Sequence, residues 1–297
     1  MDTEVETIEK PPPLVLVREA TPDDAEACGR IFYDAFESIA ARHNLPIEPG
    51  SRQFTRFKAS EMLAAHGIAG LVAERDREVI GSAFVDERDV VAGIGPVTVD
   101  PRAQDDGVGR VLMEAVLRRE RERGAVATRL VQTAYHYRSL ALYAKLGFVV
   151  REPLSVLQGT PPALSHPGLG VRPARESDIE ACAELCRHVH GHDRTEELRS
   201  AIAAGTARVV ERPEGISGYA TGFGYGWHAI GETNRDLIAL LGSAETIIGL
   251  GIIVPSRNAE LLRWCLDHSL RIVQQSTLMT IGLYNEPAGA WLPSIVY

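Results

Sequence analysis

The sequence contains little cysteine, no long apolar run and no excess of positive charge. Four cysteines in 297 residues are too few and too scattered for a disulfide framework, which predicts a reducing, cytoplasmic setting. No apolar run approaches the roughly 20 residues that a membrane-spanning helix needs. The formal net charge of −9 argues against nucleic acid or an anionic membrane as the main partner. The composition is that of a soluble globular protein.

Two common chemical motifs are also missing. No Gly-Lys-Ser/Thr follows a glycine-rich turn, which excludes a P-loop, and no complete dinucleotide-binding fingerprint is present. Cys182 and Cys186 lie four residues apart and close to histidines 188, 190 and 192, a grouping that could ligate zinc. No second cysteine pair exists to close a tetrahedral site, so we predict no metal.

The length of the chain favours two domains. Residues 1–13 are acidic and proline-rich, unlike a signal or transit peptide, and are predicted to be a flexible leader. Prolines and glycines concentrate between residues 153 and 170, which predicts a linker at 158–167 between domains at 14–157 and 168–297. Residues 17–28 and 171–182 are identical at seven of twelve positions, which indicates two copies of one domain.

Local patterns predict alternating helices and strands in the first copy, and therefore an α/β fold. The expected helices cover about 25–42 and 52–66, a stretch beginning near Val111, and the segment around Tyr143. The expected strands are 14–17, 70–74, 79–85, 90–99 and 128–133, with another beginning at Phe148.

The segment 97–110 joins the end of a strand to the start of a helix through a polar turn. Asp100-Pro101 ends the strand, and Gly107 and Gly109 precede the helix. Two glycines at a helix start let backbone N–H groups converge on one point, and the helix dipole adds partial positive charge there. The turn is therefore suited to bind a phosphate or pyrophosphate, although a single Gly-x-Gly can also be an ordinary turn.

Two segments carry a resemblance to a known family. Gln104-Asp105-Asp106-Gly107-Val108-Gly109 resembles the Gln/Arg-x-x-Gly-x-Gly/Ala loop with which the GNAT N-acetyltransferase superfamily binds the pyrophosphate of acyl-CoA. Residues 139–148, with Tyr143 followed by Leu-Gly-Phe, resemble the fourth helix of that family. The chain is thus identified as a tandem member of the superfamily. The resemblance implies two GNAT-like domains, each a mixed, splayed β-sheet flanked by helices, with a degenerate C-terminal copy.

The resemblance also implies an acetyl-CoA site in the first copy. Loop amides would bind the pyrophosphate, and backbone groups of the preceding strand would contact the pantetheine arm and the thioester. Tyr143 would be the general acid, because its ordinary pKa of about 10 lies above the roughly 8.5 of a thiol. A core packing role is the alternative for this ring. The predicted cofactor-binding residues are Val97, Val99, Gln104, Asp105, Gly107, Val108, Gly109, Arg110 and His136.

Three features of this site differ from the site that the family resemblance implies. His136 stands where the family usually has an asparagine, and it is expected to contact the cofactor rather than act as the base. Asp105 and Asp106 would repel a pyrophosphate unless their side chains turn away from it. The general base is not identified, since water often carries the proton in this family. The candidates are Asp34, Glu37, His43 and Asp86.

The second copy differs from the first at the positions that would do chemistry. Its counterpart of the loop, residues 229–234, has one glycine and carries Glu232, and Cys265 stands in the place of Tyr143. We therefore predict that this copy has no acetyl-CoA site. The apolar end of the chain, residues 291–297, is expected to dock, either on the first domain near the acceptor cleft or as part of the second core.

The predicted activity is the transfer of an acetyl group from acetyl-CoA to a primary amine of a small molecule or peptide. The enzyme is expected to be a monomer (a pseudo-dimer of its two copies) or a homodimer. A non-catalytic acyl-CoA sensor and a structural interaction protein are the alternatives. The sequence does not identify the acceptor.

Overall fold

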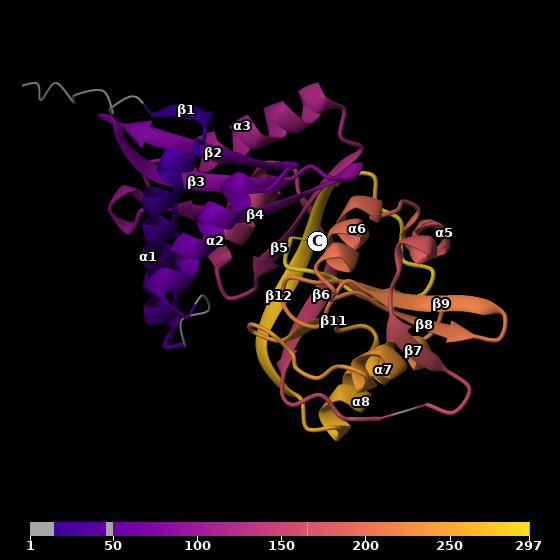
Figure 1. Ribbon diagram of the computed structural model, residues 1–297. Coiled ribbons are helices and arrows are strands. Elements are labelled where there is room, and N and C mark those ends of the chain that lie inside the picture. The colour runs from indigo at the N-terminus through magenta and orange to yellow at the C-terminus, as the bar shows by residue number, and fades with distance from the viewer. Residues whose placement is uncertain (1–14, 46–49, 165, 297) are drawn as a thin grey trace, which may run out of the picture.

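The structure is a computed structural model that describes residues 15–45, 50–164 and 166–296 (Figure 1). The predicted leader, residues 1–13, lies outside the described residues. Below, the first half denotes residues 15–158 and the second half residues 170–296, with residue 165 left aside.

Both halves run through the same order of elements: a strand, two helices, three strands, a helix, a strand, a helix and a strand. The second half adds one further strand, β13, at its end. The first half consists of β1 (Leu16–Glu19), α1 (Ala25–His43), α2 (Arg52–Ala64), β2 (Ile68–Arg75), β3 (Glu78–Asp86), β4 (Val91–Val99), α3 (Val108–Arg123), β5 (Ala127–Thr133), α4 (Tyr137–Lys145) and β6 (Val149–Gln158). The second half consists of β7 (Gly170–Pro173), α5 (Ile179–His190), α6 (Thr195–Ala203), β8 (Arg208–Arg212), β9 (Gly215–Ala220), β10 (Ala229–Gly231), α7 (Asn234–Gly242), β11 (Ile252–Pro255), α8 (Ala259–Asp267), β12 (Arg271–Gly282) and β13 (Ala290–Leu292).

An ion-pair arrangement recurs at the start of each half. Arg18 on β1 bridges Asp24, at 2.8 Å, and Glu74 on β2, at 2.5 Å. Hydrogen bonding to Arg18 lowers the pKa of Asp24 to about 2. The second half repeats the arrangement with Arg172, Asp178 and Glu211. The repeat seen in the sequence therefore has a three-dimensional counterpart.

The strands form two sheets, and the larger sheet combines strands of both halves. The larger sheet has the order β1-β2-β3-β4-β5-β12-β6-β11, and the smaller one the order β13-β10-β9-β8-β7. β12, from the second half, lies between β5 and β6 of the first half, and β6 in turn pairs with β11. Figure 1 shows β12 running beside β5 and β6 between the two lobes. The predicted mixed α/β fold with helix-flanked sheets is confirmed, while the division at residues 158–167 stays a prediction.

Helices cover both faces of the β2–β4 region. On one face, α1 and α2 pack on alternate strand residues such as Val72 and Phe84. On the other face, α3 inserts Leu112, Met113 and Val116 against the neighbouring strand positions. Because successive strand residues point to opposite faces, the short apolar strands are buried on both sides.

The first proline of the proline-rich segment before residue 170 lies within a strand. Pro153 lies inside β6, which continues to Gln158, and it pairs there with Thr277 of β12. β6 therefore ends at the residue where the predicted linker, 158–167, begins.

The end of the chain lies between the two halves (Figure 1). β13 completes the smaller sheet beside β10, so part of the tail joins the second core. Beyond it, the Ile295 N–H donates to the Tyr225 carbonyl at 2.9 Å. Val296 reaches Gly93 on β4 of the first half, where an added Cβ would lie 1.8 Å from the Val296 carbonyl oxygen. The expected docking of the tail on the first half is therefore observed.

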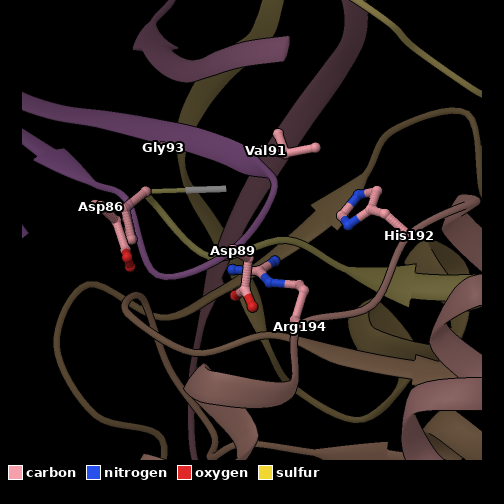
Figure 2. Close-up of a pocket in the computed structure, with 7 residues that line it drawn as sticks. Asp86, Asp89, Val91, Gly93, His192 and Arg194 are labelled. Atoms are coloured by element: carbon pink, nitrogen blue, oxygen red, sulfur yellow. The ribbon is translucent and has the colours of Figure 1, made fainter. Parts of the chain in front are cut away.

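Charged groups meet at the same junction. Figure 2 shows Asp89, from the β3–β4 connection, next to Arg194, which precedes α6. The Asp89 carboxylate also accepts a hydrogen bond from the backbone N–H of Glu196, in the first turn of α6. Asp86, His192 and Val296 line the small cavity between these groups. A carboxylate of the first half thus caps a helix of the second.

Candidate functional site

The turn after β4 is held rigidly by arginines. Asp100 is buried, and its carboxylate accepts hydrogen bonds from Arg30, at 3.0 Å, and Arg102, at 2.7 Å. Hydrogen bonding to Arg102, reinforced by Arg30, lowers the pKa of Asp100. The direction of the chain as it leaves the strand is therefore fixed by a charged anchor.

α3 begins with its backbone amides uncapped. Gly107 occupies the N-cap position in the left-handed region, at φ 80°, and no side chain caps the helix. The N–H groups of Arg110 and Val111 donate to the Gly107 carbonyl, at 3.0 and 3.1 Å. Within the described part of the chain, no backbone carbonyl accepts a hydrogen bond from the N–H groups of residues 105–109. An added Cβ at Gly107 would meet nothing within 4 Å, so open space lies beside these donors.

Both aspartates of the loop are held by arginines. Asp105 forms an ion pair with Arg138 on α4, and Asp106 pairs with Arg75 on β2 at 2.8 Å. Each negative charge therefore lies beside a positive one, which reduces the repulsion that the sequence predicted between this loop and an anion. Sequence analysis missed both arginines, because each is far from the loop along the chain and belongs to no motif.

The strand before the loop presents a free edge. β4 pairs with β5 only at residues 91–93, so the two strands separate beyond Gly93. The Asp100 N–H donates to Ile80 on β3, at 2.9 Å. Because backbone groups alternate along a strand, those of Val97 and Val99 point away from β3, into the gap toward β5. The Gln104 amide occupies one end of this edge by donating to the Val99 carbonyl at 3.2 Å.

The loop, the strand end and α4 meet at Gly109. An added Cβ at this residue would lie 3.6 Å from Leu142 on α4 and 3.7 Å from Val99 on β4. Arg110, next along α3, is exposed and forms an ion pair with Glu114 at 3.5 Å. The fold thus brings together the predicted cofactor-binding residues of the strand, the loop and the helix.

Tyr143 lies one residue beyond Leu142 on the same helix. Its ring is half-buried and packs edge-on against Phe148, with ring centroids 5.8 Å apart. Burial raises the pKa of Tyr143 to about 12. The phenol therefore keeps its proton over the whole neutral and mildly alkaline range, as a general acid requires.

His136 occupies the N-cap position of α4 and is half-buried. Burial, and secondarily the charges of Arg138 and Arg42, lower the pKa of His136 to about 4. The ring is therefore neutral at pH 7 and a weak base, which favours a polar contact over proton abstraction.

The candidate bases differ in their surroundings. Asp34 pairs with Arg52 at 2.5 Å, Glu37 approaches the same arginine at 3.8 Å, and Asp86 pairs with Arg88. The His43 ring instead lies tilted against that of Tyr135, with ring centroids 5.1 Å apart, and His43 lines a cavity. None of these residues is singled out as the base by its contacts.

The matching helix of the second half begins differently. Thr233 and Asp236 form a capping box at the start of α7, in which Asp236 accepts from the Thr233 N–H at 2.9 Å. Arg212 neutralises both Asp236 and Glu232. Cys265, in the place corresponding to Tyr143, is fully buried in the core. At the start of α7 a carboxylate therefore occupies the N-cap N–H, whereas no side chain does so at α3.

Residues 31–148 match the model of the acetyltransferase (GNAT) family. This segment is therefore similar to a GNAT domain. The match contains the uncapped loop, the open edge of β4 and Tyr143, and it ends at Phe148. It covers none of the second half.

Solved structures extend the likeness in fold to the whole chain. A protein of Pyrococcus horikoshii assigned as an acetyltransferase aligns over 96% of this chain and 96% of its own, with a TM-score of 0.70 and 22% identity. A GCN5-related N-acetyltransferase from Sphaerobacter thermophilus aligns over 92% and 96%, with a TM-score of 0.61 and 15% identity. At these identities the likeness shows the fold. The comparison with curated proteins gave no match.

The described residues contain neither a membrane-spanning helix nor a metal-ligand cluster. No described helix is both long enough and apolar enough to cross a membrane. Over residues 15–45, 50–164 and 166–296, no three or more His, Cys, Asp or Glu side chains are grouped as metal ligands would be. Cys182 and Cys186 lie instead in the apolar core.

Proposed function

We propose that the chain transfers the acetyl group of acetyl-CoA to a primary amine, using the site in its first half. The observation that carries this proposal is the uncapped start of α3 beside the open edge of β4 and Tyr143. A row of unpaired N–H donors at a helix start fits a pyrophosphate. A free strand edge fits an amide-containing arm such as pantetheine, which can add to it as a strand would.

In this proposal each group of the site has one task. The amides of residues 105–109 hold the pyrophosphate, while Arg138 and Arg75 neutralise the loop aspartates. Val97 and Val99 align the arm through their backbone, and a β4 N–H polarises the thioester carbonyl as the amine attacks. Tyr143 then gives its proton to the departing thiolate, and the proton of the attacking amine leaves through water or a nearby base. His136 borders the cofactor as a neutral polar group.

The second half is proposed to be a degenerate copy without an acetyl-CoA site. Its helix α7 is closed by the capping box of Thr233 and Asp236, and its counterpart of the acid is a buried cysteine. An anion approaching α7 would have to displace Asp236, whose side chain is buried and bound to Arg212. We therefore expect one acetyl-CoA per chain.

Calorimetric titration and a thiol-release assay with a panel of amines test this proposal. Wild-type protein should bind acetyl-CoA at one site and release CoA when a suitable amine is present. Gly109→Glu should abolish both, because it places a bulky anion between the loop, β4 and α4. Gly226→Glu is the matched control, since Gly226 is exposed in the second half and has open space around it.

The possible outcomes separate the alternatives. If Gly109→Glu binds acetyl-CoA as wild type does, or if two molecules bind per chain, the assignment of the site is wrong. Normal binding with no turnover over the panel would favour a non-catalytic acyl-CoA sensor. Absence of binding would favour a structural role for both halves.

A further inference from the structure

The short strand β10 occupies the place in the second half that the end of β4 occupies in the first. The N–H group that follows β4, from Asp100, donates to a carbonyl of β3 at 2.9 Å. The N–H group that follows β10, from Glu232, donates to a carbonyl of β9 at 2.9 Å. Counted back from these two bonds, residues 229–231 of β10 correspond to residues 97–99 of β4. On its side away from β9, β10 therefore has the same backbone edge that β4 presents on its side away from β3.

A strand of the chain occupies this edge in the second half. Within the described residues, β4 pairs with β5 only at residues 91–93, so its edge beyond them has no strand partner on that side. β13 instead pairs antiparallel with all of β10, with Ala229 opposite Leu292 and Gly231 opposite Ala290. β13 also contacts β11, the counterpart of β5. β13 therefore fills the gap whose counterpart in the first half has no strand in it.

The contact between β13 and β10 is made by backbone groups. Because these groups alternate along a strand, those of Ala229 and Gly231 point away from β9 and toward β13. Gly289, just before β13, packs closely on this edge, since an added Cβ there would lie 2.6 Å from the Gly231 carbonyl oxygen. In the proposed function, the corresponding groups of Val97 and Val99 align the pantetheine arm. β13 thus makes through its peptide groups the contacts that the arm makes through its amides.

The side chains of β13 hold it in place on both faces of the sheet. Ala290 and Leu292 belong to the apolar cluster that contains α7, and Trp291 belongs to the cluster that contains α5. The Trp291 ring meets that of His190 edge-on, with ring centroids 5.4 Å apart. All three side chains of β13 are buried. An extended ligand must displace them to reach the edge of β10, so β13 keeps this slot closed.

The neighbouring place for a pyrophosphate is closed by a separate device. Asp236 caps the start of α7 with its carboxylate, which is buried and pairs with Arg212 at 2.6 Å. A pyrophosphate at this helix start would meet a fixed negative charge in place of free N–H donors. The edge of β10 therefore suits only an arm that is not attached to a nucleotide.

We propose that the second half contains a slot for an acylated pantetheine arm without a nucleotide, and that β13 occupies this slot as an internal substitute for the arm. The inference rests on the proposed function, because the place of the arm is taken from the first half. Pantetheine carries amide groups along an extended chain, so it can pair with a strand edge as a peptide does. The arm can bind only when β13 leaves β10.

The probe for this slot is S-acetylpantetheine, and amide shifts in heteronuclear NMR spectra of the full chain report where it binds. In wild-type protein the probe should shift the amides of Val97 and Val99 only. Ala290→Pro removes the N–H that faces Gly231, so it should release β13 and let the probe also shift the amides of Ala229 and Gly231. Acetyl-CoA should shift the amides at β4 in both proteins and those at β10 in neither.

Two further variants make the test specific. Ala290→Ser is the matched control, because it keeps the N–H and adds only a hydroxyl at the same position, and it should respond to the probe as wild type does. Trp291→Ala weakens β13 through its side chain, and it should expose the slot as Ala290→Pro does. It serves as the opening variant if Ala290→Pro does not fold.

The outcomes separate this inference from the proposed function. If the amides of Ala229 and Gly231 exchange faster with solvent in a folded opening variant, yet do not shift with the probe, the edge of β10 is not a slot for the arm. The inference is also overturned if these amides exchange at the wild-type rate in both opening variants, or if the probe shifts them in wild type, because β13 then does not close the edge. If neither ligand shifts Val97 or Val99, the proposed function fails and the inference falls with it.

Discussion

The two loop aspartates show how far single residues could be interpreted from the sequence. Asp105 and Asp106 are neighbours of a predicted anion site, and in the sequence they only argue against it. In the structure Arg138 and Arg75 pair with them, and the amides next to them remain open. Neither ion pair could be predicted, because the residues around an isolated arginine in a helix or strand do not identify its partner. The role of Gly107 could be predicted, because the residue before the helix adopts a left-handed backbone conformation that favours glycine.

Tyr143→Phe tests the proposed acid at this scale. The ring packs against Phe148, so phenylalanine should keep the fold and the affinity for acetyl-CoA. Turnover should fall roughly 100-fold or more if thiolate protonation limits the rate, which is the usual size of a general-acid contribution. Steady-state kinetics from pH 6 to 9.5, with binding measured by calorimetry, provide the check.

The pH series also tests the raised pKa of Tyr143. Since burial raises that pKa to about 12, wild type should show no alkaline loss of kcat from this residue within the measured range. A kcat that is the same in both proteins across the series would leave Tyr143 with a packing role only.

At the level of elements, the sequence was most informative where one segment carried its own signal. The helices α1 and α2 and the hairpin β2–β3 match their predicted ranges, because apolar periodicity and turn residues are local properties. No local sequence pattern predicted that β12 lies between β5 and β6. The partners of a strand depend on contacts with segments that are distant in the sequence, so the residues of β12 alone do not identify them.

The start of α6 provides an element-scale prediction of pH dependence. Burial, with smaller effects from Glu197 and Asp86, raises the pKa of Asp89 from 3.8 to about 6, although Arg194 opposes the shift. The folded state therefore binds this proton more tightly than the unfolded chain does. Stability is thus lost as the pH rises from about 4 to 6, and the loss persists above that range.

Asp89→Asn cannot ionise, yet its amide oxygen can still accept from the Glu196 N–H. Its melting temperature relative to wild type should therefore rise by roughly 2–4 °C between pH 4 and pH 7. Thermal unfolding at four or five pH values measures this difference. Asp76→Asn, in the exposed β2–β3 turn, is the control and should show no such trend. A constant difference across the series would mean that Asp89 does not carry this proton.

For the whole molecule, the shared larger sheet and the position of the tail make the two halves one unit. β12 of the second half lies between β5 and β6 of the first half, and β6 lies between β12 and β11 of the second half. Ile295 and Val296 contact the two halves at their junction. A second half that lacks an acetyl-CoA site can still be required, because it supplies a central strand of the sheet that carries the first site.

Gly93→Ala tests whether the tail holds the halves together. A Cβ at this position would lie 1.8 Å from the Val296 carbonyl oxygen, and the clashing atom belongs to the backbone, so a rotamer change cannot relieve it. The tail must shift or detach, and we expect a loss of about 1–3 kcal/mol in the free energy of unfolding. Gly226→Ala, whose added methyl meets nothing within 4 Å, should cost far less. Thermal unfolding measures both, and digestion by a carboxypeptidase should be faster in Gly93→Ala because its tail is displaced. If the two variants have the same free energy of unfolding and the same rate of digestion, the contact between the tail and β4 does not help to hold the halves together.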